Sequence, residues 1–355
     1  MLHYFFHAQN PPHVNIDSDL DFVLRVVFGS GSGNFAQPGS RSGAWRWAER
    51  LGLGDRLAAV LDMARAQALL GAELAERLNG TLERSRSDAN ARAEVQQRLE
   101  CAIGSSGIEV VLLRHAATSS DQGSCVSGTD LDILVRDTEY QRLVVDLVNA
   151  GCVTNLRPVP WSARRSGGLV ISGHAGAALV VHRELRFLRM VPGGVFIDLD
   201  CLKRCGQLLR DDVTKKFIWL PSKAVQAADV VAQLLVEQRF SPEFAAFRAL
   251  LIAQRLGLAH DEDLAFDAYL MLQTDVEHAE FEALRELLGG LGEGKLVDLS
   301  KRARTLLDHF VAAATAPSYR ARLQLQRKAQ VWQHEGHLER AAEKVGKVLA
   351  RATRR

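Results

Sequence analysis

The sequence has 355 residues, of which 47% are hydrophobic and 24% charged, and its formal net charge is +2. This length exceeds that of a usual domain, so we expect two or three packed units rather than a single core. The small net charge does not demand a nucleic acid or an acidic protein as a partner.

Cysteine usage and the N-terminus indicate the compartment. The five cysteines are scattered, form no CxxC pair and are odd in number, which favours reduced thiols over a disulfide framework. No apolar run is long enough to span a bilayer, and residues 1–6 (MLHYFF) lack the basic start and the cleavage site of a signal peptide. We therefore expect a cytoplasmic protein.

Residues 1–100 are expected to form an N-terminal, mostly helical region. Between residues 44 and 84 apolar side chains recur at helical spacing, interrupted at 52–54, and residues 85–98 are polar and helix-favouring. The Gly-rich stretch 29–33 is not followed directly by a helix start, a Walker Lys or a GxGxxG pattern. We interpret it as a surface connection rather than a phosphate-binding loop.

Residues 101–220 are predicted to form an α/β unit with a mixed sheet, because short apolar runs alternate there with loops and one helix. The predicted helix covers residues 138–149 and ends at Gly151. The predicted strands cover residues 108–113, 130–135, 169–171, 178–182, 185–190 and 194–200.

Residues 221–317 are expected to form a C-terminal helical domain. Ser222 is a suitable N-cap, and Ser241 followed by Pro242 opens a further helix. Residues 245–256 are almost wholly apolar, which predicts burial on more than one side.

Residues 318–355 form a basic tail with ten Lys or Arg against three Glu, a local charge of +7. A weak apolar stripe lies opposite the basic residues. This pattern is compatible with docking on a membrane surface or a protein partner, and also with a solvated terminal helix. It gives no strong indication of nucleic-acid binding.

The stretch 127–135 (SGTDLDILV) carries the clearest chemical signal. On a strand, Asp130 and Asp132 would leave the same face of the sheet while Leu131 and Ile133 point to the other. Hard cations such as Mg²⁺ prefer oxygen ligands, and carboxylates bridge such ions in phosphoryl-transfer sites. The alternative interpretation is a strand edge with two solvated carboxylates.

A third carboxylate from a neighbouring strand would complete such a site. Asp198 and Asp200 both follow an apolar run at residues 195–197. We prefer Asp198 as the ligand, because Asp200 lies nearer the end of the predicted strand. The alternative for Asp198 is a cap at the end of that strand.

The GTDLDILV motif, the helix that ends at Gly151 and the segment FIDL at 196–199 together resemble the nucleotidyltransferase superfamily with a DNA-polymerase-β-like core. The likeness is greatest to bacterial members of uncharacterised substrate in which a helical unit flanks the core. It covers residues 108–202, a little over a quarter of the chain. The resemblance implies an α/β (α+β) nucleotidyltransferase core with a mixed β-sheet, flanked by N- and C-terminal helical regions.

The resemblance also implies an activity, which is transfer of a nucleoside monophosphate from ATP or another NTP to a hydroxyl acceptor, with two Mg²⁺ ions. Asp130 and Asp132 would hold both ions, and Asp198, with Asp200 as the other candidate, would bind the ion that activates the acceptor. The acceptor would be a small molecule, a sugar, a lipid-linked molecule or a peptide.

The chain departs from the family pattern at the phosphate loop, where Gly-Ser normally follows the first strand. Here the sequence after Leu113 is RHAATSS, and Gly-Ser comes only at 123–124. Three possibilities are open: Thr118 and Ser119 hold the triphosphate with help from Arg114, the loop is rebuilt around Gly123 and Ser124, or triphosphate binding is lost. The nucleotide-binding candidates are Arg114, Thr118, Ser119, Gly123, Ser124, Gly128 and Thr129.

Two other functions remain open at the level of the sequence. One is nucleotidylation of a protein target, as in toxin and antitoxin members of the superfamily. The other is a catalytically inactive scaffold that binds RNA, a membrane or a protein through its basic tail, and the unusual phosphate loop is the main argument for it.

Overall fold

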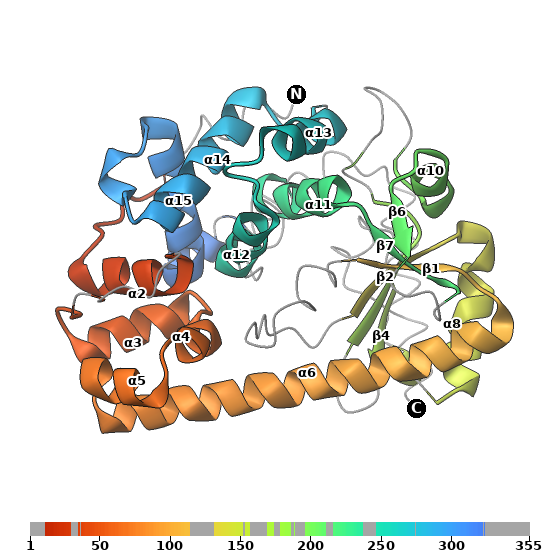
Figure 1. The fold of residues 1–355 in the computed structure, drawn as a ribbon, viewed down its shortest axis with the longest axis horizontal. Coiled ribbons are helices and arrows are strands. Elements are labelled where there is room, and N and C mark those ends of the chain that lie inside the picture. The colour runs from red at the N-terminus through yellow and green to blue at the C-terminus, as the bar shows by residue number, and fades with distance from the viewer. Residues whose placement is uncertain are drawn as a thin grey trace.

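The residues described by the computed structural model contain a mixed sheet of seven strands in the order β3-β4-β5-β2-β1-β7-β6 (Figure 1). β2 is parallel to β5 and antiparallel to β1, and β1 is parallel to β7. The mixed α/β fold class is therefore confirmed. The strands are β1 (Val110–Leu113), β2 (Leu131–Val135), β3 (Val153–Leu156), β4 (Leu169–Gly173), β5 (Ala178–His182), β6 (Leu208–Arg210) and β7 (Ile218–Pro221).

Helices precede and follow the sheet, as the sequence predicts. They are α2 (Ser18–Phe28), α3 (Arg41–Arg50), α4 (Gly54–Val60), α5 (Met63–Leu70), α6 (Ala72–Ser106), α8 (Tyr140–Asn149), α10 (Leu199–Arg204), α11 (Lys223–Leu235), α12 (Ala246–Leu256), α13 (Glu262–Leu272), α14 (His278–Glu293) and α15 (Lys301–Thr315). In the part of the chain that is described, no helix combines the length and the apolar character needed to cross a bilayer.

The structure describes residues 11–29, 35, 37–113, 131–151, 153–156, 169–173, 178–185, 188, 196–210, 216–236, 246–273, 275–321 and 323. Three of the predicted features lie wholly or mostly outside these ranges. Ser241 with Pro242, most of the Gly-rich stretch 29–33, and the basic tail from residue 324 onward lie outside the described residues.

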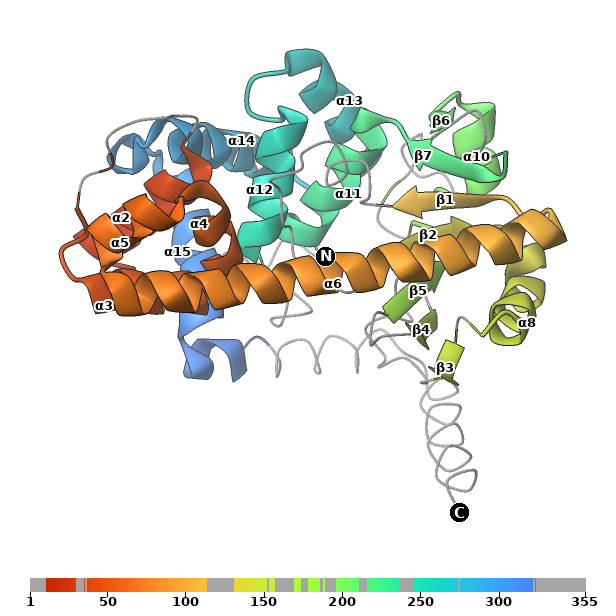
Figure 2. The same ribbon diagram turned by 60° about the horizontal axis from the view of Figure 1, so that its bottom comes forward.

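α6 links the N-terminal helices to the sheet. Its 35 residues correspond to a length of about 52 Å. The first half packs on α4 and α5, and the second half packs beside β2 and α8 (Figure 2). The helix ends at Gly107, whose φ of +69° favours glycine, and its amide caps the carbonyl of Ile103. The expected division at residue 100 therefore falls inside a continuous helix.

The two faces of the sheet contact different layers. Leu131, Ile133 and Val135 of β2 pack in one core with the second half of α6 and with α8. Leu134 packs in the opposite core, which contains α10, α11 and most of the other helices. Because side chains alternate along a strand, Asp132 shares the face of Leu134.

Helices from the two ends of the chain share that second core. The ring of Phe28 in α2 lies edge-on to the ring of Phe247 in α12, with centroids 6.4 Å apart. Arg248 Nε donates to the carbonyl of Gly52 at 3.0 Å, and Gln254 Nε2 donates to the carbonyl of Phe28 at 2.9 Å. The N-terminal and C-terminal helices therefore pack as one body, although the sheet separates them in sequence.

Two predicted strands differ from the observed structure. Residues 194–200 were expected to be extended, but α10 begins at Leu199, and Ile197 forms only an isolated bridge with Leu185. The carboxylate of Asp198 caps the first turn of α10, which ends the extended segment. Of the strand predicted over 185–190, the described residues show only the bridge at Leu185.

Candidate active site

Asp132 lies near the start of β2, in the middle of the sheet. Its register partners are Leu113, the last residue of β1, and Val180 of β5. Asp132 is 9% exposed, whereas Leu131 and Ile133 are buried on the opposite face. The predicted alternation is confirmed from Leu131 to Ile133, and it directs the carboxylate of Asp132 to the face of the sheet that carries the α10–α11 layer.

His182, at the end of β5, hydrogen-bonds to that carboxylate. Its Nε2 lies 2.8 Å from Oδ1 of Asp132, and His182 is 4% exposed. The register pairs His182 with Leu134, so it lies diagonally across from Asp132 on the same face of the sheet. An ionised carboxylate only accepts hydrogen bonds, so when Asp132 is ionised the donor is Nε2–H of His182.

Sequence reasoning missed His182. The sequence predicts only an apolar strand for residues 178–182 (ALVVH), and the structure confirms this strand. The signal available in the sequence was the polar residue at the end of an apolar strand. Such a residue either points to solvent or faces a partner across the sheet. Without the pairing of β5 with β2, the sequence cannot identify that partner.

Asp130 and the nucleotide-binding candidates belong to residues 114–130, which lie outside the described residues. Those candidates are Arg114, Thr118, Ser119, Gly123, Ser124, Gly128 and Thr129. The described ends of this connection are Leu113 and Leu131, and both are next to Asp132, one by register and one by sequence. The described chain therefore stops at Leu113 and resumes at Leu131, at the ends of β1 and β2 where Asp132 lies.

Asp198 is the N-cap of α10. Its Oδ1 accepts a hydrogen bond from the amide of Cys201 at 2.7 Å. The flanking Ile197 and Leu199 are buried in the same core as Leu134, so this segment lies on the side of the sheet to which Asp132 points. Asp198 is thus a cap, as in the alternative interpretation, but of a helix rather than of a strand. Its metal-binding role stays a prediction.

Asp200 pairs with Arg136 instead of approaching Asp132. The distance from Arg136 Nε to Asp200 Oδ1 is 2.7 Å. Arg136 follows the last residue of β2, four positions after Asp132, which is roughly 13 Å along a strand. The described contacts therefore place Asp200 at the far end of β2 from the candidate site.

An ionic cluster surrounds Arg136 and attaches α10 and β7 to this end of the sheet. Glu109 accepts hydrogen bonds from Arg136 at 2.7 Å, from Lys203 at 2.6 Å and from the indole of Trp219 at 3.2 Å. Burial alone would raise the pKa of Glu109, but the hydrogen bonds from Lys203 and Arg136 outweigh it and hold this pKa below its usual value.

Replacing Glu109 by Gln is expected to destabilise the protein in a pH-dependent way. Because the folded-state pKa of Glu109 is depressed, its ionic contribution is complete above the ordinary value of 4.5 and is lost as the pH falls through the folded pKa. Denaturant unfolding should show a loss of about 1–2 kcal/mol near neutral pH that shrinks below pH 4.5. Glu73→Gln, at an exposed pair with Arg77, should show a loss near zero; equal losses for both variants at every pH would contradict this role.

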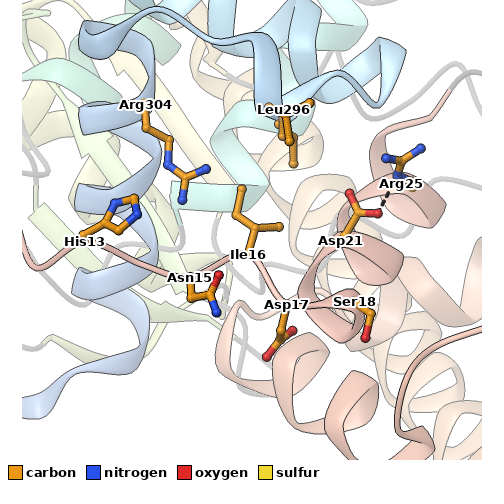
Figure 3. A pocket seen from close by; sticks show the side chains of 10 residues that line it. His13, Asn15, Ile16, Asp17, Ser18, Asp21, Arg25, Leu296 and Arg304 are labelled. Carbon is orange, nitrogen blue, oxygen red and sulfur yellow. Dashed lines mark hydrogen bonds and ion pairs between the residues drawn. The ribbon is translucent and has the colours of Figure 1, made fainter.

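A cavity of about 380 Å³ that several charged side chains line lies far from β2, between the N-terminal segment, α2 and α15 (Figure 3). Its charged side chains have partners within the protein. Asp21 pairs with Arg25 at 2.7 Å, Arg304 pairs with Asp308 at 3.2 Å, and Asp17 caps α2. We interpret this cavity as a junction between the two ends of the chain rather than a binding site.

Known proteins offer no match for comparison, since no family model, no curated protein and no solved structure matches the chain. Within the described residues, no group of three or more His, Cys, Asp and Glu side chains is arranged to hold a metal. The pair of Asp132 and His182, next to the ends of residues 114–130, is the feature on which a functional proposal rests.

Proposed function

We propose that this chain is a metal-dependent nucleotidyltransferase that moves a nucleoside monophosphate from an NTP to a hydroxyl acceptor. The observation that carries the proposal is the buried carboxylate of Asp132 at the start of β2. It lies beside the two ends of the segment that contains every nucleotide-binding candidate. His182 already hydrogen-bonds to this carboxylate, and a divalent metal ion that accompanies a triphosphate would add positive charge beside it.

The donor chemistry fits a divalent ion. Asp132 offers a carboxylate, and Asp130, two positions earlier, would share its face if the strand alternation continues. When bound, divalent ions would neutralise the charge that develops on the transferred phosphoryl group. Asp130 and Asp132 would hold these ions, and Asp198 would bind the ion nearer the acceptor.

The remaining task of the protein is positioning. Phosphoryl transfer needs little covalent chemistry from side chains, because aligned groups and fixed charges supply most of the rate enhancement. Amides and hydroxyls of residues 114–130, with Arg114, would orient the triphosphate. A small molecule, sugar, lipid-linked molecule or peptide would provide the hydroxyl.

A transfer assay tests the proposal. The full chain is incubated with each α-labelled NTP, Mg²⁺ or Mn²⁺, and a panel of hydroxyl acceptors that includes cell extract, and the products are identified by mass spectrometry. We expect an added nucleoside monophosphate that depends on the metal and disappears with a chelator. The scaffold alternative predicts instead no metal-dependent thermal shift with any NTP, together with RNA or membrane binding that weakens steeply with salt.

A further inference from the structure

The geometry of Asp132 and His182 suits two ligands of one ion. Metal–oxygen and metal–nitrogen bonds of about 2.1 Å place neighbouring ligand atoms about 3.0 Å apart at octahedral angles. The observed separation of 2.8 Å between Oδ1 and Nε2 is close to that value. An ion that displaced the proton of this hydrogen bond would lie to one side of the line between the two atoms. The imidazole would have to tilt to direct its lone pair at the ion, while Oδ1 and Nε2 keep nearly their present separation.

The neighbouring strands provide no oxygen ligand in the described positions nearest to Asp132. Its partner on β5 is Val180, and its partner on β1 is Leu113, both apolar. On β5, the polar side chain that faces Asp132 is the imidazole of His182. Among the described residues, the sheet thus supplies one carboxylate and one imidazole at this position.

This donor set selects among metals. Mg²⁺ prefers oxygen ligands in an octahedral arrangement, whereas imidazole nitrogen suits transition-metal ions. Mn²⁺ shares the preference of Mg²⁺ for oxygen ligands, but as a transition-metal ion it accepts an imidazole more readily, and it serves the same phosphoryl-transfer chemistry. Asp132 and His182 are 9% and 4% exposed, and the pairing of β2 with β5 fixes the positions of their backbones.

We infer that His182 is a metal ligand through Nε2, together with Asp132, and that this site therefore binds Mn²⁺ in preference to Mg²⁺. The inference rests on the proposed function only in taking a metal to bind at Asp132. It differs from the three-carboxylate, magnesium site that the sequence predicts.

Electron paramagnetic resonance of Mn²⁺ bound to the full chain tests this directly. Nitrogen from a bound imidazole gives a modulation of the electron spin echo, whereas carboxylate and water oxygens do not. We expect this modulation in the wild type and its loss in His182→Gln, which keeps a donor for Asp132 but removes the imidazole. The Kd for Mn²⁺ should rise by at least about tenfold in His182→Gln, and the Kd for Mg²⁺ should change less.

His309→Gln is the matched control. His309 is also a buried imidazole, and its Nδ1 lies 2.8 Å from the hydroxyl of Tyr319 as a hydrogen-bond partner, but it lies in α15. Its variant should keep the nitrogen modulation and the affinity for Mn²⁺. Three results would overturn the inference: no Mn²⁺ binding by the wild type, bound Mn²⁺ without nitrogen modulation, or modulation that persists in His182→Gln.

The two proposals can fail separately. If the modulation is present but no NTP is used as a donor, His182 is a metal ligand and the nucleotidyltransferase proposal is wrong. If transfer proceeds with Mg²⁺ and bound Mn²⁺ shows no nitrogen modulation, the function stands and the role of His182 is wrong.

Discussion

Replacing Asp132 by Asn should lower nucleotidyl transfer by roughly 10³-fold or more, because it removes a charge that would hold the metal and thus orient the phosphates. The fold should persist. The amide oxygen of Asn can still accept the hydrogen bond from His182 Nε2, which the structure places at 2.8 Å from the Asp132 carboxylate. Initial rates with labelled NTP, together with a thermal melt, measure both effects.

Asp132→Ala provides a contrasting variant, since it should lose both activity and stability. Removing the acceptor leaves the buried imidazole of His182 without this hydrogen bond, at a cost of about 1–3 kcal/mol. Asp21→Asn is the matched control for the change of carboxylate to amide, because Asp21 pairs with Arg25 in α2, away from the sheet. Wild-type rates for Asp132→Asn would rule out the proposed role of this carboxylate.

Asp198 needs a substitution that separates its two roles. Asp198→Ser retains a side-chain oxygen that can cap α10, so stability should change little. If Asp198 also binds the metal nearer the acceptor, the same variant should lose activity about as strongly as Asp132→Asn. If Asp198→Ser is stable and fully active, Asp198 only caps α10 and does not bind the metal.

Replacing Phe247 by Ala should lower the free energy of unfolding by about 3–5 kcal/mol. Phe247 is 1% exposed and lies edge-on to Phe28, so the substitution opens a cavity between α12 and α2. Because both ends of the chain share this core, the N-terminal helices should lose stability together with the C-terminal ones. Denaturant unfolding followed by circular dichroism and by tryptophan fluorescence measures this.

Phe266→Ala is the control for that substitution. Phe266 lies in α13 and is 63% exposed, so its removal should change stability by no more than about 0.5 kcal/mol. Similar small losses for Phe247 and Phe266 would contradict a shared core.

The elements with local signals were predictable from the sequence. The apolar run of β2, the helix that ends at Gly151 and the Ser222 cap of α11 are all observed. Each depends on periodicity or capping within a few residues. Asp198 shows where this fails, because alternating apolar and acidic residues describe a strand as well as a short helix with its N-cap.

The features that sequence reasoning missed depend on non-local pairing. His182 contacts Asp132 only because β5 lies beside β2. Asp200 lies at the other end of β2 because it forms an ion pair with Arg136. Likewise, the contact of α2 with α12 joins two regions that the sequence treats as separate. Such contacts need the topology, which no local pattern encodes.

The most direct test of the account is a crystal structure of the full chain with Mn²⁺ and a non-hydrolysable NTP, using the anomalous signal of manganese to locate the ion. The account predicts a peak about 2.2 Å from a carboxylate oxygen of Asp132, with the triphosphate held by residues 114–130. Density for the ion and the nucleotide elsewhere, with no peak at Asp132, would contradict it.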